Sequence, residues 1–474
     1  MAFWNRTKSF EAATTRSTHS GLKPTLSWVH LVGLGVGGIV GTGIYTLTGV
    51  GAGMAGPAVI LSFVIAGVVC AAAALAYAEM ATMIPMAGSA YTYTYVALGE
   101  LMAWIVGWTL ILEYTVVCSA VAVGWSGYAG GVIRSLGWPV PEALLAGPFA
   151  GGLVNVPAIV ISLAVAGLLA IGSRESATVN LLLVGIKLVA LAIFIALALP
   201  AFNASHFEPF APFGYGSTEI ADGTKRGVMA AAAIIFFAFY GFDAVSTAAE
   251  ETKNPKRDLK IGIIGSMVLC TLLYMVVATA ALGGSRYQDL ASSTEPLAMV
   301  LRGLNHPLAA TLIASAAVIA LPTVIMAFMY GQSRIFFVMA RDGLLPQRLS
   351  AVNARSGTPV LMTFITSIIV ALIAAFVPLQ NIASVANAGT LIAFIAVAVC
   401  MIVTRRTHPQ HPRMFGEVAT WIIGLFAIAG CLWLFDSLQT RTKLSVLIWN
   451  AVGLAIYLLW ARRRSLLEPA AKPT

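Results

Sequence analysis

Charged residues are scarce in this 474-residue chain, in which Asp, Glu, Lys and Arg together make up 10% of the sequence. Ordinary soluble domains contain roughly a quarter of charged residues, most of them on the surface. Hydrophobic residues make up 59% of the chain. The shortage of charge excludes a water-soluble globular protein and predicts an integral membrane protein surrounded by lipids.

Cysteine and histidine are also scarce, with five and six residues respectively. All five cysteines fall in apolar stretches without the spacing of a metal site, which favours a role as small packing residues. The six histidines are scattered, and none stands at metal-ligand spacing or beside a candidate nucleophile. We therefore expect no metal, no cofactor and no enzymatic activity.

The sequence also lacks the short alternating segments of a membrane β-barrel, and its first 27 residues lack the apolar core of a cleavable signal peptide. It contains instead long apolar runs, each sufficient to cross a hydrocarbon core about 30 Å thick. These runs predict an all-α membrane protein with twelve transmembrane helices. The predicted spans lie at 28–53, 57–82, 100–128, 153–172, 178–199, 227–252, 260–283, 307–333, 358–377, 381–404, 416–436 and 443–461.

Most of the 28 Lys and Arg residues fall in loops on the same side of the membrane as the N-terminus. Because cytoplasmic loops carry this excess, we expect both tails, 1–27 and 462–474, in the cytoplasm and the loop 200–226 outside the cell membrane. Topology then accounts for the net charge of +9, and no nucleic-acid partner is expected. The sequence leaves the oligomeric state open.

One basic residue, Lys187, lies near the middle of the fifth predicted span. A charge at the centre of a bilayer costs about 3 kcal/mol or more, so such residues usually face the bundle interior and mark an ion or substrate path. Three acids, Glu79, Glu113 and Asp243, also lie within spans. Lys187 is therefore either half of a structural lysine–carboxylate pair or a group that takes up and releases a proton.

The first span is rich in glycine at its centre, where residues 35–49 read GVGGIVGTGIYTLTG. Each glycine costs a helix interior about 1 kcal/mol relative to alanine, so the cluster predicts local unwinding, although close helix packing is an alternative. Unwound backbone in a membrane must line a cavity or be buried in protein. The freed N–H groups of Thr42 to Ile44 would suit a carboxylate, and the freed carbonyls of Ile39 and Val40 an ammonium. Together they describe a site for a free amino acid.

The sixth predicted span, AAAIIFFAFYGFDAVSTAAE, is interrupted in a similar way by Gly241, which is followed by Asp243. Paired broken spans in corresponding positions are typical of transporters built from inverted repeats. Residues 28–199, with spans one to five, and 227–404, with spans six to ten, would form the two repeats. Spans eleven and twelve, in 405–461, would lie outside them.

These segments resemble the amino acid–polyamine–organocation superfamily, and most closely its cationic amino acid transporter branch, which includes bacterial relatives. The same resemblance extends over GSAYTYTYVALGE at 88–100, GWTLILEYTVVCSAVAVGWSGY at 107–128 and SRIFFVMARDGLLP at 333–346. It covers Leu31 to Pro346 with the motifs in order. The resemblance implies a LeuT-type fold of five plus five spans with two extra helices, and transport of L-amino acids by alternating access.

The resemblance also implies roles for individual residues in the unwound parts of the first and sixth spans. Thr42, Gly43 and Ile44 would hold the substrate carboxylate through their N–H groups. The stretch with Phe236, Phe237, Phe239 and Gly241 would supply carbonyls for the amino group and an aromatic gate. We expect Phe237 to be that gate.

The same resemblance assigns the three ionisable groups. Glu113 would face the side-chain end of the pocket and pair with a basic substrate. Lys187 would stand in for the sodium ion of other transporters, which makes a proton the coupling ion and disfavours sodium. Asp243 would act as a gate or as the partner of Lys187.

Substrate and coupling mode remain open at this point. Glu113 favours arginine, lysine or ornithine, whereas a protonated Glu113, or large residues such as Met326, Phe328 and Met329 facing the pocket, would favour small neutral amino acids such as alanine. Proton symport and amino-acid exchange use the same fold. A receptor that binds amino acids without moving them is a further alternative. We also expect SRIFFVMARDGLLPQRL, at 333–349, to form a short helix on the membrane surface.

Overall fold

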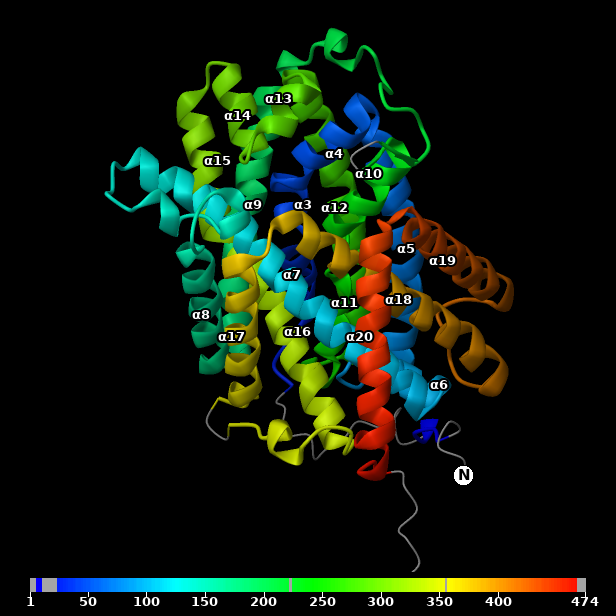
Figure 1. Ribbon diagram of the computed structural model, residues 1–474. Coiled ribbons are helices and arrows are strands. Elements are labelled where there is room, and N and C mark those ends of the chain that lie inside the picture. Colours follow the sequence, from blue (N-terminus) through cyan, green and yellow to red (C-terminus); the bar gives the residue numbers. More distant parts are fainter. Residues whose placement is uncertain (1–5, 11–23, 221–223, 354–355, 467–474) are drawn as a thin grey trace, which may run out of the picture.

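Helices form almost all of the part of the chain that the computed structural model describes (Figure 1). Among these residues, one small antiparallel sheet pairs the two-residue strands β1 (Thr218–Glu219) and β2 (Lys225–Arg226). Much of the predicted tails 1–27 and 462–474 lies outside the described residues. The described residues are 6–10, 24–220, 224–353 and 356–466.

The α-helices follow one another with short connections. They are α2 (Trp28–Ile39), α3 (Thr42–Tyr45), α4 (Leu47–Ala55), α5 (Val59–Met83), α6 (Ala90–Ala97), α7 (Glu100–Ser135), α8 (Val156–Ile171), α9 (Ser173–Ala198), α10 (Val228–Ile235), α11 (Phe242–Thr247), α12 (Pro255–Gly284), α13 (Tyr287–Ser292), α14 (Pro296–Gly303), α15 (Pro307–Ala320), α16 (Pro322–Arg341), α17 (Val360–Phe376), α18 (Leu379–Thr407), α19 (Glu417–Ser437) and α20 (Thr440–Leu459).

Ten helical segments of the described chain are long and apolar enough to cross a membrane. The predicted spans 153–172 and 358–377 coincide with α8 and α17, which are apolar but only 16 and 17 residues long. About 20 residues are needed for a perpendicular crossing, so these two helices fall at the short limit. The structure therefore agrees with an all-helical membrane protein: ten described segments are long enough to span a membrane, and shorter apolar helices stand at the other two predicted spans.

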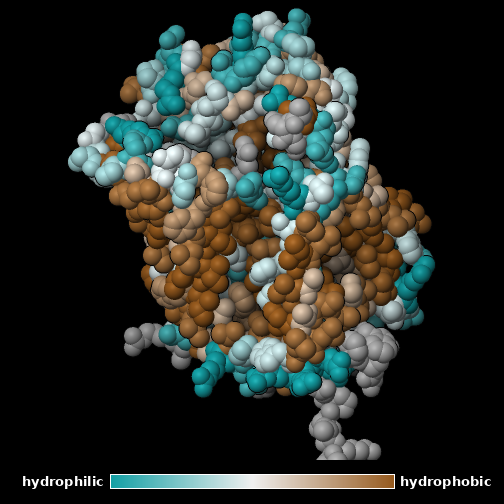
Figure 2. All heavy atoms as spheres, viewed as in Figure 1, coloured by the Kyte–Doolittle hydropathy of each residue, from teal (hydrophilic) through white to brown (hydrophobic). Residues whose placement is uncertain are grey.

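The surface of the bundle has the polarity that a bilayer requires. Figure 2 shows a belt of hydrophobic residues around the middle of the molecule, with hydrophilic residues gathered at both ends. Large apolar side chains such as Leu272 on α12, Ile422 on α19 and Leu447 on α20 are exposed on the bundle. Leaving these groups in water would be costly, whereas in a hydrocarbon layer they are solvated. This distribution supports an integral, multi-pass membrane protein.

The two ends of the bundle are distinguishable by the segments they carry (Figure 1). At one end, which we call the N-terminal face, Arg6–Phe10 contacts the bundle. There, Lys8 Nζ forms an ion pair with Asp342 Oδ1 at 2.7 Å, and the Phe10 ring stacks on His408 with centroids 4.0 Å apart. The opposite face carries the β-sheet and helices α13 and α14.

The surface helix expected at 333–349 is wrong for most of its length. Residues up to Arg341 continue α16 into the bundle, and only Gln347–Ser350 forms a separate 3₁₀ turn. Arg334 can be buried in this helix because its guanidinium makes a two-point ion pair with Glu251, with both N···O distances at 3.1 Å. This pairing satisfies a guanidinium that would otherwise need water.

Candidate functional site

The first predicted span is interrupted where its glycines cluster. Helix α2 ends at Ile39, Val40 and Gly41 have non-helical backbone angles, and α3 begins at Thr42. Glycine is needed here for close approach: a Cβ built on Gly43 would lie 2.4 Å from the Cα of Ala238, and one on Gly41 would lie 2.4 Å from a methyl of Val324. The first contact is with backbone, which cannot move aside as a side chain can.

The sixth predicted span is interrupted at the same depth of the bundle. Helix α10 ends at Ile235, a 3₁₀ turn covers Phe236–Ala238, and α11 begins at Phe242. Gly241 has φ +127°, a conformation that L side chains rarely adopt, and a Cβ there would lie 2.7 Å from the carbonyl carbon of Gly38. The two interruptions therefore touch each other.

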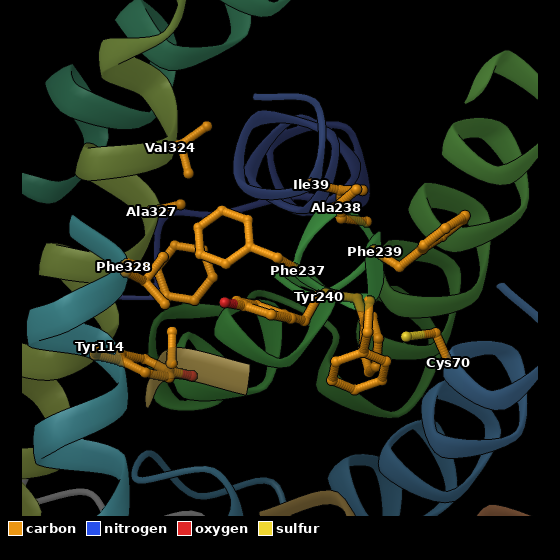
Figure 3. Close-up of a cluster of buried hydrophobic side chains, with 14 of the residues drawn as sticks. Ile39, Cys70, Tyr114, Phe237, Ala238, Phe239, Tyr240, Val324, Ala327 and Phe328 are labelled. Carbon is orange, nitrogen blue, oxygen red and sulfur yellow. The ribbon is translucent and has the colours of Figure 1, made fainter. Parts of the chain in front are cut away.

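A small cavity lies between the two interruptions. Figure 3 shows part of its wall, with Phe237, Tyr240 and Phe328 converging from the sixth span and α16. Most of the lining is apolar, and the polar groups come from the backbone, from Thr42 and from Tyr240. The lining residues are Gly38, Ile39, Gly41, Thr42, Gly43, Val117, Val121, Phe237, Tyr240, Val324 and Phe328.

The three candidate aromatics of the sixth span point in different directions. Phe237 lines the cavity and lies edge-on to Tyr240, with centroids 5.1 Å apart. Phe239 turns away from it (Figure 3), and its ring packs on that of Tyr274, with centroids 5.3 Å apart. Phe236 packs on α18 instead. Of the three, only Phe237 is placed to contact a molecule in the cavity.

The backbone groups at the first interruption are partly occupied. The N–H of Ile44 donates to the carbonyl of Gly41 at 3.1 Å, which leaves Thr42 and Gly43 as the better-placed donors for an anion. The carbonyl of Ile39 accepts a hydrogen bond from Tyr274 Oη at 2.5 Å. A carbonyl has two acceptor positions, so this bond does not exclude a second donor.

Lys187 lies fully buried on α9 and holds the end of α2. Its Nζ donates to the carbonyl of Gly37 at 3.0 Å, to the carbonyl of Val40 at 2.5 Å and to Thr323 Oγ1 at 2.6 Å. An ammonium has three protons, so these acceptors satisfy it completely. Within the part of the chain that the structure describes, Lys187 makes no ion pair within 4.0 Å of a carboxylate. The geometry gives no support to the structural lysine–carboxylate pair that the sequence left open.

Glu113 is buried on α7, one helical turn from the cavity-lining Val117, but it is not part of the lining. Its Oε1 accepts a hydrogen bond from Thr390 Oγ1 at 2.7 Å, and its Oε2 has no partner among the described residues. The rings of Tyr114 and Phe328 pack edge-on, 5.1 Å apart, beside the cavity (Figure 3).

Asp243 lies in the first turn of α11, near the cavity but apart from Lys187. Its Oδ2 accepts a hydrogen bond from Tyr114, and its Oδ1 accepts one from the N–H of Gly241 at 3.0 Å. The carboxylate thus fixes the backbone at the second interruption and ties it to α7. Of its two expected roles, the position beside the break suits a gate.

Glu79 lies outside this site, in an ion pair near the N-terminal face. Its Oε1 is 3.5 Å from Arg413 Nη1, its Oε2 accepts a hydrogen bond from the N–H of Phe415 at 3.2 Å, and both side chains of the ion pair are almost completely buried. Arg413 also donates to the carbonyl of Thr404 at 2.5 Å. The pair fastens the connection between α18 and α19 to α5.

Removing Glu79 should therefore cost stability. We expect Glu79→Ala to lower the free energy of unfolding by about 3 kcal/mol, because a buried guanidinium loses its counter-charge. Arg134→Ala is the matched control, since the Arg134–Glu142 pair is exposed and should contribute about 1 kcal/mol or less. Thermal unfolding of the purified proteins in detergent measures both, and equal shifts in melting temperature would contradict the assignment.

Several residues of the site were not predicted from the sequence. Thr323, which binds Lys187, follows a proline in the eighth predicted span, and Tyr274 lies in the seventh. A polar residue in an apolar span was the available signal for both. Val121 and Val324 gave no signal, because a cavity-lining valine and a lipid-facing valine have the same local sequence.

Comparison with known proteins places the chain among transporters. A family model described as amino acid permease matches residues 26–460. The branched-chain amino acid permease BcaP of Bacillus subtilis (strain 168) is 43% identical over 456 residues, which cover 95% of this chain and 96% of that protein. The methylthioribose transporter of the same organism is 39% identical over 466 residues, covering 98% and 99%. Cationic amino acid transporter 4, vacuolar, of Arabidopsis thaliana is 36% identical over 398 residues, covering 82% and 64%.

Proposed function

Because this chain belongs to the amino acid permease family, whose named relatives are transporters and not enzymes, we propose that it moves neutral, apolar L-amino acids across the cell membrane. Transport would proceed by alternating access in a LeuT-type arrangement, with 28–199 and 227–404 as inverted repeats and 405–461 outside them. The supporting observation is the cavity between the two interrupted spans, which offers backbone groups at one end and apolar side chains elsewhere.

The apolar lining supports a neutral substrate. Val117, Val121, Val324 and Phe328 would surround the substrate side chain, and burying each methylene there contributes about 0.8 kcal/mol. A cationic side chain would need a carboxylate, and Glu113 stands outside the lining with Thr390 as its partner. Aliphatic amino acids such as leucine, isoleucine and valine fit this chemistry, and a relative that is 43% identical is named for branched-chain substrates.

Lys187 supports a proton as the coupling ion in place of sodium. A neutral lysine would no longer offer a positive charge to the carbonyls of Gly37 and Val40, so protonation would bias the position of α2 relative to α9. The excess of basic residues on the N-terminal face supports a cytoplasmic location for that face. Phe237, at the edge of the cavity, would be the aromatic gate.

The decisive test is uptake of labelled leucine, alanine and lysine into proteoliposomes in sodium-free buffer, with and without an inward proton gradient. We expect leucine to accumulate about 10-fold or more over lysine, which corresponds to a preference of about 1.4 kcal/mol. Accumulation without the gradient, only in vesicles preloaded with amino acid, would establish an exchanger. Binding without any movement would establish a receptor.

Glu113→Gln separates the two substrate hypotheses within the same assay. The substitution keeps the acceptor for Thr390 and removes the negative charge. If the substrate is neutral, the preference for leucine over lysine should change by less than about threefold. A collapse of lysine uptake in this variant, with leucine unaffected, would show that Glu113 binds a cationic side chain.

A further inference from the structure

Two buried asparagines stand in matching places beside the two interrupted spans. Asn180, on α9, donates from Nδ2 to the carbonyl of Gly33 at 2.9 Å. Asn387, on α18, donates from Nδ2 to the carbonyl of Ala233 at 2.7 Å. The amide oxygens of both asparagines are buried and have no hydrogen-bond partner among the described residues.

The two acceptor carbonyls occupy the same position relative to the interruptions. Gly33 lies seven residues before Val40, at which the first span leaves the helix, and Ala233 lies seven residues before Tyr240, which precedes Gly241. In the second span the α-helix itself ends earlier, at Ile235, and a 3₁₀ turn over Phe236–Ala238 leads to Tyr240. Each asparagine therefore holds the helix that precedes the non-helical residues of its span, at a carbonyl seven residues before Val40 or Tyr240.

The correspondence continues along the helices that carry the asparagines. Seven residues after Asn180 stands Lys187, which binds the end of α2. Seven residues after Asn387 stands Phe394, whose ring lies 5.8 Å from Phe236 and 5.1 Å from Phe242, on either side of the second interruption. An inverted repeat would produce this shared register, with Phe394 in the second half at the position that Lys187 occupies in the first.

We propose that Asn180 and Asn387 are equivalent positioning residues that clamp the two half-helices in their closed positions. Asn180 would hold α2 on the N-terminal face, and Asn387 would hold α10 on the opposite face, so each bond must break for the gate on its own side to open. The assignment rests on the transport function proposed above. Loss of Asn180 then favours the state open to the N-terminal face, and loss of Asn387 favours the state open to the opposite face.

A single cysteine reporter can measure both shifts. Gly127 lines a cavity on the opposite face, together with Thr46, Asn155 and Thr294, and a Cβ at Gly127 would meet no heavy atom within 4 Å. All five native cysteines are buried. The rate at which a water-soluble maleimide labels the purified Gly127→Cys protein therefore reports how open this cavity is.

In the Gly127→Cys background, we expect Asn387→Leu to raise the labelling rate about threefold or more and Asn180→Leu to lower it by a similar factor. Leucine has the same number and branching of side-chain heavy atoms as asparagine, and it removes the unpartnered oxygen as well as the donor. Asn450→Leu is the matched control, because Asn450 pairs with Thr109 between α20 and α7, away from both interruptions. Its labelling rate should not change.

Opposite changes in labelling rate in the two asparagine variants would distinguish clamping from a general loss of packing. Shifts of the same sign, or no shift, in proteins that still take up labelled leucine would overturn the clamps. Failure of the parent Gly127→Cys protein and of the unmodified protein to take up any amino acid would overturn the transport function instead. Where a leucine variant does not yield folded protein, Asn180→Ala and Asn387→Ala must show the same opposite shifts.

Discussion

Replacing Lys187 by methionine is expected to abolish the accumulation of amino acid that an inward proton gradient drives. Methionine keeps most of the length and the apolar stem of lysine but removes the ammonium, which binds the carbonyls of Gly37 and Val40 and the hydroxyl of Thr323. Among the described residues, Lys187 is the lysine or arginine that binds the end of α2, so without its ammonium the conformational equilibrium should lose its dependence on the proton. We expect accumulation to fall roughly 100-fold, in the upper part of the usual range of coupling between sites.

Exchange of labelled for unlabelled amino acid in preloaded vesicles should persist, at a reduced rate, because exchange needs the site and the moving parts without net proton transfer. Gly185→Ala is the control on the same helix, since a Cβ there meets no heavy atom within 4 Å. Thr323→Val keeps the ammonium and removes one acceptor, so an intermediate effect is expected. Full proton-driven accumulation by the methionine variant would remove Lys187 from the coupling mechanism.

The positions of the helices could be predicted because hydropathy is a local property. A long apolar run favours lipid over water whatever the rest of the chain does. Most predicted spans therefore coincide with helices of the bundle. Helix α6 was not predicted, because it is short and contains polar residues. Its place depends on distant contacts, such as the hydrogen bond at 3.0 Å from Tyr91 to Asp342, which follows α16.

The sequence predicted how deep in the membrane the site residues lie, but not the directions in which their side chains point. A glycine cluster in the first span and Gly241 in the sixth indicated the two interruptions, and Lys187, Glu113 and Asp243 are buried as expected. Which group each would meet could not be predicted, because helices that are apolar on every side give no indication of the direction in which a given residue points. The sequence left open whether Lys187 pairs with a carboxylate, and in the structure it binds backbone carbonyls instead. Glu113, which was expected to face the pocket, accepts a hydrogen bond from Thr390 beside the cavity.

The backbone contact between the two interruptions makes Gly43 the most sensitive position of the site. A Cβ at Gly43 would lie 2.4 Å from the Cα and 2.5 Å from the Cβ of Ala238, far inside ordinary contact. Gly43→Val, and even Gly43→Ala, should therefore push α3 away from the 3₁₀ turn and displace the N–H groups of Thr42 and Gly43. Since each hydrogen bond to a charged group contributes about 1.5–3 kcal/mol, losing both should weaken binding about 100-fold or more.

Ligand-dependent thermal stabilisation of the purified protein measures this loss directly, because a ligand that binds only the folded state raises the melting temperature. Gly127→Ala is the matched control: a Cβ at Gly127 contacts nothing and should leave the leucine-dependent shift intact. A folded Gly43→Val protein with a normal shift would place the substrate elsewhere in the bundle. The alternative outcome is that Gly43→Val loses the leucine-dependent shift while Lys187→Met keeps it. Substrate binding and proton coupling would then depend on different residues of the same interruption, in agreement with the separate contacts of Gly43 and Lys187.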